Sequence, residues 1–161
     1  MVEFVGTTGT DILSGTAGDD ILTPLGTTVS TDREVLRGLD GADTYNLQRS
    51  SADTYNFVID DRGTDGAINN ITNAGALYHS ASFGYSGYAT AVRVNGNLII
   101  HLPNKPYRFH SPAKPSYDIK IKDQYGDGHV ETLQAGGVTY NLAIGTVGTA
   151  TEDFMAGSKL A

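Results

Sequence analysis

The sequence predicts an all-β protein, with a short parallel β-roll over residues 5–73 followed by an antiparallel β-rich capping region over residues 74–161. Two patterns carry this prediction. Residues 6–23 hold one nine-residue pattern twice, GTTGTDILS and GTAGDDILT. From residue 89 onward the pattern changes to alternating apolar and polar residues, which is typical of half-buried strands. The composition agrees, because 20 glycines and no tryptophan or cysteine suit short strands and turns better than long buried helices.

The nine-residue frame continues beyond its two clear copies. GLDGADTYN at 38–46 keeps the glycines and the aspartate, and VSTDREVLR at 29–37 has a glutamate in the acid position. SSADTYN at 50–56 repeats the end of GLDGADTYN, and the repeats end near residue 73. Each copy is predicted to be a turn followed by a three-residue strand. These predicted strands are 12–14, 21–23, 35–37, 44–46 and 54–56.

Strands of this length are too short to be stable alone, so successive copies must stack. Stacking buries the residue at the eighth position of each copy between two layers of parallel strands. The predicted core residues are therefore Leu13, Leu22, Leu36, Tyr45 and Tyr55. Each full circuit of the roll contains two copies. The loops between successive strands therefore fall alternately on two opposite edges of the roll.

The acidic residues concentrate in the repeats. Residues 1–66 carry twelve acids against four arginines, a net charge of −8, whereas residues 67–161 carry +1. An acidic, glycine-rich half disfavours binding to nucleic acid or anionic membranes and favours a cation as partner. Ca²⁺ fits best, because it accepts about six to eight oxygen ligands, from carboxylates and backbone carbonyls, in flexible geometry.

The two edges predict two rows of metal ligands. One edge stacks Asp20 on Asp43, and a Ca²⁺ shared by these two residues is the preferred single site. The predicted ligands are, on this edge, Asp20, Asp43, Asp60, Asp61 and Asp65 and, on the opposite edge, Asp11, Glu34 and Asp53, with backbone carbonyls near Gly9, Gly18 and Gly41.

GTTGTDILS and GTAGDDILT resemble the nonapeptide repeats of RTX, or haemolysin-type, calcium-binding proteins, whose pattern is G-G-x-G-x-D-x-U-x. In both copies threonine stands in place of the second glycine. The stretch from NLIIHLP at 97–103 to VTYNL at 138–142 also resembles the β-rich segment that commonly follows such repeats. The resemblance implies a parallel β-roll folded by Ca²⁺, in a protein exported unfolded by a type I secretion system through an uncleaved C-terminal signal.

The expected function is a calcium-binding module that folds outside the cell and supports the secretion and stability of a larger protein, without catalysis of its own. Low cytosolic Ca²⁺ keeps the repeats unfolded, and millimolar extracellular Ca²⁺ supplies folding free energy. We find no signal peptide at the N-terminus and no apolar run of about 20 residues that would span a membrane. Export without an N-terminal signal agrees with the type I route.

Three other patterns allow a second interpretation. KDQYGDG at 122–128 could be a further calcium loop, but a plain turn is preferred because the EF-hand positions do not match. The four histidines lack the spacing of a zinc or catalytic site. The tyrosine-rich segment 78–107 could stack against sugars, which would make the chain a Ca²⁺-stabilised polysaccharide or cell-surface binding module; a structural role in the C-terminal sheet is preferred.

Overall fold

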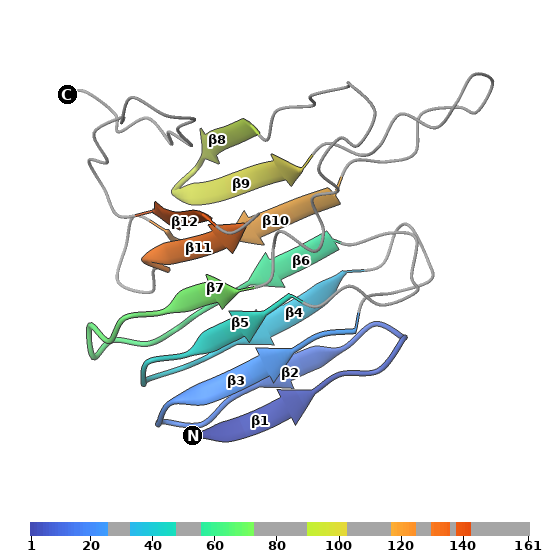
Figure 1. The fold of residues 1–161 in the computed structure, drawn as a ribbon, viewed down its shortest axis with the longest axis vertical. Helices are drawn as coiled ribbons and strands as arrows, with labels where there is room; N and C mark the ends of the chain where they lie inside the picture. The colour runs from blue at the N-terminus through green and yellow to red at the C-terminus, as the bar shows by residue number, and fades with distance from the viewer. Residues whose placement is uncertain are drawn as a thin grey trace.

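The computed structural model describes residues 1–25, 33–47, 56–72, 90–102, 117–124, 130–135 and 138–142, which form strands and no helix. The strands form two six-stranded sheets, stacked in Figure 1. In order across the first sheet, the strands are β1 (Val2–Val5), β3 (Asp20–Thr23), β5 (Thr44–Asn46), β7 (Asn70–Thr72), β11 (Thr132–Ala135) and β12 (Val138–Asn141). In order across the second sheet, they are β2 (Ile12–Ser14), β4 (Glu34–Arg37), β6 (Asn56–Ile59), β10 (Tyr117–Ile121), β9 (Asn97–Leu102) and β8 (Thr90–Val94).

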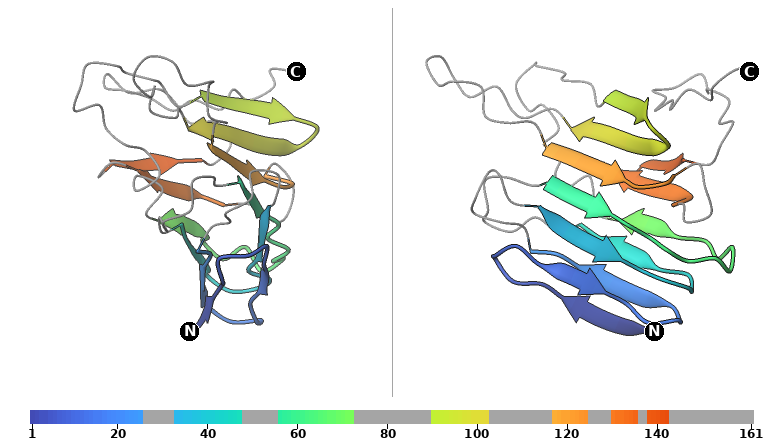
Figure 2. Two further views of the ribbon diagram at one scale, coloured as in Figure 1. Left: turned by 90° about the vertical axis from the view of Figure 1, so that its right-hand side faces the viewer. Right: turned by 180° about the vertical axis from the view of Figure 1, so that it is seen from behind.

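From β1 to β7, successive strands alternate between the two sheets. Each strand from β3 to β7 pairs in parallel with the strand two places earlier in the chain. Each full turn of the chain therefore adds one strand to each sheet, and the left view of Figure 2 shows the sheets as two facing layers. The all-β prediction is confirmed for the described residues.

The pairing register aligns the apolar residues into two rows that face each other between the sheets. In the first sheet Leu22 pairs with Tyr45, and Tyr45 pairs with Ile71. In the second sheet Leu36 pairs with Leu13 on one side and Ile59 on the other. All of these side chains are fully buried except Leu13, which packs against the core from one end. The core predicted from the eighth repeat position is thus confirmed for Leu22, Leu36 and Tyr45.

The register departs from the nine-residue frame at β6. A strand over 54–56 was predicted, but β6 runs from Asn56 to Ile59, and Ile59 continues the row of Leu36. The position expected for Tyr55, which lies outside the described residues, is therefore taken by a residue four places later. The physical reason is hydrophobic: Phe57, Val58 and Ile59 are all buried, which the shorter polar strand could not achieve.

Strand β1 was not predicted, although it belongs to the first sheet and pairs with β3. Two antiparallel hairpins occur among the described C-terminal strands. β8 and β9 pair antiparallel around Asn95 and Gly96, which have φ of 50° and 80°. β11 and β12 form the second antiparallel hairpin. No helix in the described part of the chain is long and apolar enough to cross a membrane.

The C-terminal strands also extend both sheets. β10 pairs in parallel with β6, and β11 pairs in parallel with β7. Antiparallel pairing is confined, among the described strands, to β8–β9–β10 and β11–β12. One core consequently runs from Leu22 to Leu142 without a break in its cluster of buried residues.

Candidate metal centre

Three turns that enter strands of the first sheet lie one above another at the left edge of Figure 1. We call them the turn stack: residues 15–19, 38–43 and 60–69. Hydrogen bonds join the turns, since the Gly41 amide donates to Asp65 Oδ2 (2.8 Å) and the Ala42 amide donates to Asp19 Oδ1 (3.0 Å). Gly41, with φ of 110°, allows this approach, because a Cβ there would lie 2.7 Å from the Asp19 nitrogen.

A row of polar side chains runs along this edge, where β3, β5, β7 and β11 of the first sheet begin: Asp20 is the first residue of β3, and Asp43, Asn69 and Glu131 directly precede the other three strands. In each case the side chain accepts a hydrogen bond from the backbone amide of the residue in register with it on the neighbouring, earlier strand of the same sheet. Asp43 Oδ1 accepts from the Asp20 amide (2.9 Å), and Asn69 Oδ1 accepts from the Asp43 amide (2.9 Å). Glu131 Oε2 accepts from the Asn69 amide (2.6 Å). The predicted stacking of Asp20 on Asp43 is therefore present, and Asn69 and Glu131 extend it.

The sequence analysis missed Asn69 and Glu131 as members of this row. They lie outside the clear repeats, and Glu131 is 62 residues from the amide that it binds. Their position at the start of a strand of the first sheet is the signal they share with Asp20 and Asp43. That signal becomes usable only when the strand order is known.

Asp43 is the least satisfied acid of the row. Its side chain is fully buried, and its Oδ2 atom has no hydrogen-bond partner among the described residues. Burial raises the pKa of Asp43 to about 7, and the negative charges of Asp61 and Asp20 add to the effect. A Cβ on Gly38 would collide with Asp43 Oδ2, so this glycine is required for the carboxylate to sit inside the turn.

Asp61 lies in the same turn stack and has a second unsatisfied oxygen. Its Oδ2 accepts a hydrogen bond from Asn69 Nδ2 (2.7 Å), whereas its buried Oδ1 has no partner among the described residues. Burial raises the pKa of Asp61, although hydrogen bonds from Tyr45 and from backbone amides oppose the shift. The Tyr45 hydroxyl accepts a hydrogen bond from the Gly38 amide (3.1 Å), which ties it to the same turn.

On the opposite edge, Asp11 and Glu34 occupy adjacent register positions, since each lies one residue before the paired residues Ile12 and Val35. Glu34 is fully buried, and neither of its carboxylate oxygens has a hydrogen-bond partner among the described residues. Burial raises the pKa of Glu34 to about 7, and the Asp11 charge adds to it. The next register position holds Phe57. Asp53, predicted for this row, lies outside the described residues.

Asp60 has a different environment. Its Oδ2 atom is 2.7 Å from Arg62 Nη2, 3.3 Å from Lys122 Nζ and 3.5 Å from Arg37 Nε. Burial alone would raise the pKa of Asp60, but Arg62 and Lys122 outweigh it, and the pKa is lowered. A carboxylate already paired with three cations is poorly placed to bind a metal ion, so we leave Asp60 out of the proposed metal site.

Asp65 links two turns of the turn stack, and both of its carboxylate oxygens accept hydrogen bonds from backbone amides. Besides the hydrogen bond from Gly41, its Oδ1 accepts one from the Ala67 amide (3.1 Å). These two backbone hydrogen bonds, with Ala67 first, lower the pKa of Asp65. Residues 125–128 of the KDQYGDG segment lie outside the described residues, as do the tyrosines 78, 85, 88 and 107.

Within the part of the chain that the structure describes, no group of three or more His, Cys, Asp or Glu side chains is arranged to hold a metal ion. Side chains alone would therefore not complete a site, but Ca²⁺ also accepts backbone carbonyl oxygens. Such oxygens point between the turns: a Cβ on Gly15 would lie 2.6 Å from the Gly38 carbonyl oxygen, and one on Gly41 would lie 2.8 Å from that of Gly18. Comparisons with protein-family models, curated proteins and solved structures gave no match.

Proposed function

We propose that this chain is a calcium-binding module built as an RTX-like parallel β-roll over residues 5–73 with an antiparallel β cap over 74–161. It folds on Ca²⁺ outside the cell and supports the secretion and stability of a larger protein exported by a type I system. It has no catalytic activity of its own. One observation carries the proposal: the Asp43 carboxylate is buried in the turn stack with one oxygen unsatisfied.

A buried carboxylate with a free oxygen destabilises the folded chain unless it takes up a proton or a cation. Asp43 and Asp61 both have such an oxygen in the same turn stack. Carbonyl oxygens of the neighbouring turns, those of Gly18 and Gly38, supply further hard ligands close by. Oxygen donors of these two kinds suit Ca²⁺ better than Mg²⁺, which requires tight octahedral geometry and retains its water.

We assign Glu34 to a second position at the opposite edge, because both of its oxygens are buried without a hydrogen-bond partner in the described part of the chain. Ca²⁺ that binds the folded chain but not the unfolded chain stabilises the folded state by RT ln(1 + [Ca²⁺]/Kd). This free energy is about 4 kcal/mol when the Ca²⁺ concentration is a thousandfold above Kd. That contribution is large against the total stability of a small domain, about 5–15 kcal/mol. Export into millimolar Ca²⁺ would therefore switch the module from unfolded to folded.

A Ca²⁺ titration followed by circular dichroism tests the proposal, with Mg²⁺ in a parallel titration. We expect Ca²⁺ to increase β structure and Asp43→Asn to raise the Ca²⁺ concentration at half-folding about tenfold or more. Asp123→Asn is the matched control, because Asp123 is exposed and outside the turn stack. If the chain is fully folded in EDTA and Ca²⁺ changes neither its spectrum nor its melting temperature, the proposal is wrong.

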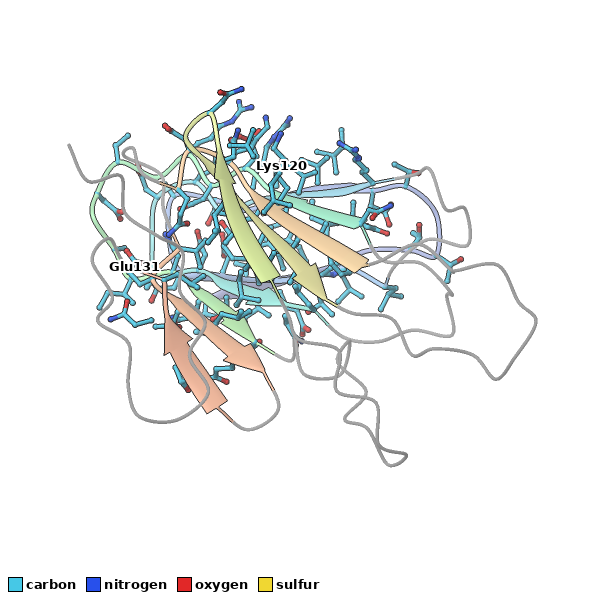
Figure 3. The ribbon with its side chains drawn as sticks, turned by 90° about the horizontal axis from the view of Figure 1, so that it is seen from above. Lys120 and Glu131 are labelled. Carbon is cyan, nitrogen blue, oxygen red and sulfur yellow. The ribbon has the colours of Figure 1, made fainter. Side chains whose placement is uncertain are left out.

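The outer face of the second sheet favours a second candidate function, a module that binds an anionic polysaccharide. A pocket of about 190 Å³ lies on this face. Its lining residues are Arg33, Asn56, Phe57, Val58, Ile99 and Lys120. Lys120 stands between Ile119 and Ile121, which are both buried, so its side chain is on the outside of β10, as Figure 3 shows. Two cations beside an apolar floor suit a carboxylated sugar ring.

Binding to polygalacturonate, with neutral dextran as the control polymer, tests this candidate in saturating Ca²⁺. We expect the double variant Arg33→Gln and Lys120→Gln to weaken binding, and the loss to be greatest at low salt because the contacts are ionic. Lys122→Gln is the control, since Lys122 is engaged with Asp60. Equal binding by the wild type and the double variant would exclude this pocket as the binding site.

A further inference from the structure

The copies of the repeat differ at their second position, which is Thr7, Thr16 or Leu39. This residue affects the hydrogen bonding of the acid four residues later. Thr7 donates hydrogen bonds to Asp11 through both its amide and its hydroxyl. Thr16 does the same to Asp20 Oδ2, at 2.6 Å from its amide and 2.8 Å from its hydroxyl. Two independent copies of the repeat thus close their turns through the same pair of hydrogen bonds.

Each threonine hydroxyl also receives a hydrogen bond from the glycine two residues later. Gly9 donates to Thr7 Oγ1 (3.1 Å), and Gly18 donates to Thr16 Oγ1 (3.3 Å). Asp20 Oδ1 accepts from the Val2 amide (3.1 Å), so both oxygens of Asp20 have donors from the protein itself. Burial alone would raise the pKa of Asp20, but the hydrogen bonds from Thr16 and Val2 outweigh it, and the pKa is lowered.

The third copy lacks this arrangement. Its second position is Leu39, which has no hydroxyl group and adopts φ of 76°. The corresponding acid, Asp43, keeps a hydrogen bond to Oδ1 from the Asp20 amide, but its buried Oδ2 has no donor among the described residues. Of the three copies that the structure describes in full, two therefore have an acid satisfied by the protein and one does not.

We infer that, in the three copies described in full, the residue at the second position determines whether the turn acid is stabilised by the protein or left for a cation. Thr7 and Thr16 close their turns without metal, and Leu39 leaves Asp43 as the acid that requires it. This inference rests on the proposed function, and it gives Asp20 and Asp43 different roles at the site where the sequence predicted a shared Ca²⁺. Thr16 acts here as a specificity-determining residue that touches no metal ion.

The physical reason is competition for the same lone pairs. A carboxylate oxygen that already accepts two short hydrogen bonds gains little by exchanging them for a cation whose other ligands must also be ordered. An oxygen with no donor gains the full interaction. Threonine in place of the second glycine of the repeat thus reduces the number of Ca²⁺ ions that folding requires.

The number of Ca²⁺ ions taken up on folding tests the inference. It is the slope of the logarithm of the folding constant against the logarithm of free Ca²⁺, measured by urea unfolding of the full chain at several Ca²⁺ concentrations. Thr16→Val removes only the hydroxyl, and we expect the slope to rise by about one as Asp20 becomes available. Thr64→Val is the control, because the Thr64 hydroxyl makes only a 3.4 Å contact to Asp40.

Thr16→Ser keeps the hydroxyl and should retain the wild-type slope, which separates the hydrogen bond from the methyl group. We also expect the unfolding constant of Thr16→Val to rise about tenfold at the lowest Ca²⁺ concentration and less at the highest. A lower stability with an unchanged slope would overturn the inference. A wild-type slope of zero would instead refute the proposed function, so the two failures are distinguishable.

Discussion

Replacing Gly41 with alanine tests whether close contact between the turns holds the metal centre together. Gly41 adopts φ of 110°, a backbone conformation that residues with a side chain rarely adopt. An added Cβ would lie 2.5 Å from the Gly18 carbonyl carbon and 2.7 Å from the Asp19 nitrogen. Both contacts are to backbone atoms that cannot rotate away, so the two turns must move apart.

Gly66→Ala is the matched control for Gly41→Ala. Gly66 also has positive φ, 71°, but no atom lies within 4 Å of the Cβ position. Its substitution should therefore cost only the backbone term, about 1–2 kcal/mol. Gly41→Ala carries a similar backbone term and adds about 1–3 kcal/mol for overpacking, so it should lose about 2–5 kcal/mol in total.

Urea unfolding at fixed millimolar Ca²⁺, followed by circular dichroism, measures both free energies of unfolding. The Ca²⁺ concentration at half-folding should also rise more for Gly41→Ala, because the added methyl group pushes the Gly18 carbonyl away from the turn that holds Asp43. Equal losses of stability in the two variants would refute a role for close contact between the turns, since the positive φ that both glycines share would then explain the whole loss.

Three further predictions concern the core, the buried acids and the ion-pair cluster. Leu22→Ala, at a fully buried position in register with Tyr45, should lower the free energy of unfolding by about 2–5 kcal/mol, whereas Ile12→Ala, at a residue that is 62% exposed, should change it by about 0.5 kcal/mol or less; similar losses in denaturant unfolding would contradict the assigned core. In EDTA, the folded fraction should fall as pH rises from about 5 to 8. The pKa values of Glu34 and Asp43 are raised to about 7 in the folded chain, so the folded state holds protons that the unfolded state has released. A folded fraction that rises over this interval would show that these carboxyls are not buried as described. Arg62→Ala should change stability little, because the Arg62 side chain is 55% exposed and Lys122 still pairs with Asp60. Asp60→Ala should cost more, since it leaves Arg37, Arg62 and Lys122 facing one another. Calorimetry at low and high salt compares the two variants.

Much of the repeat architecture could be predicted from spacing alone. The strands at Ile12–Ser14 and Thr44–Asn46 have the predicted bounds, and those predicted at 21–23 and 35–37 start one residue earlier. Spacing succeeds here because a turn of constant length followed by a strand of constant length returns equivalent residues to equivalent positions. The assignment of Asp20 and Asp43 to one edge follows from the same alternation.

Spacing fails where the turns change length. β6 begins later than predicted, and Phe57 rather than an acid lies beside Glu34. Asn69 and Glu131 join the row of Asp20 and Asp43 from positions that no nine-residue frame reaches. Hydrophobic burial and strand pairing decide the register at these points, and both depend on residues distant in the chain.

Local periodicity and composition were enough to predict the β-rich fold class, the alternation of turns between two edges and the concentration of acids in the repeats. They did not determine which acids remain unsatisfied. Asp20 and Asp43 occupy the same position of the repeat, yet one is saturated by hydrogen bonds and the other is not. Only the tertiary structure decides this, because the donors available to a buried carboxylate come from whichever backbone and side chains pack around it.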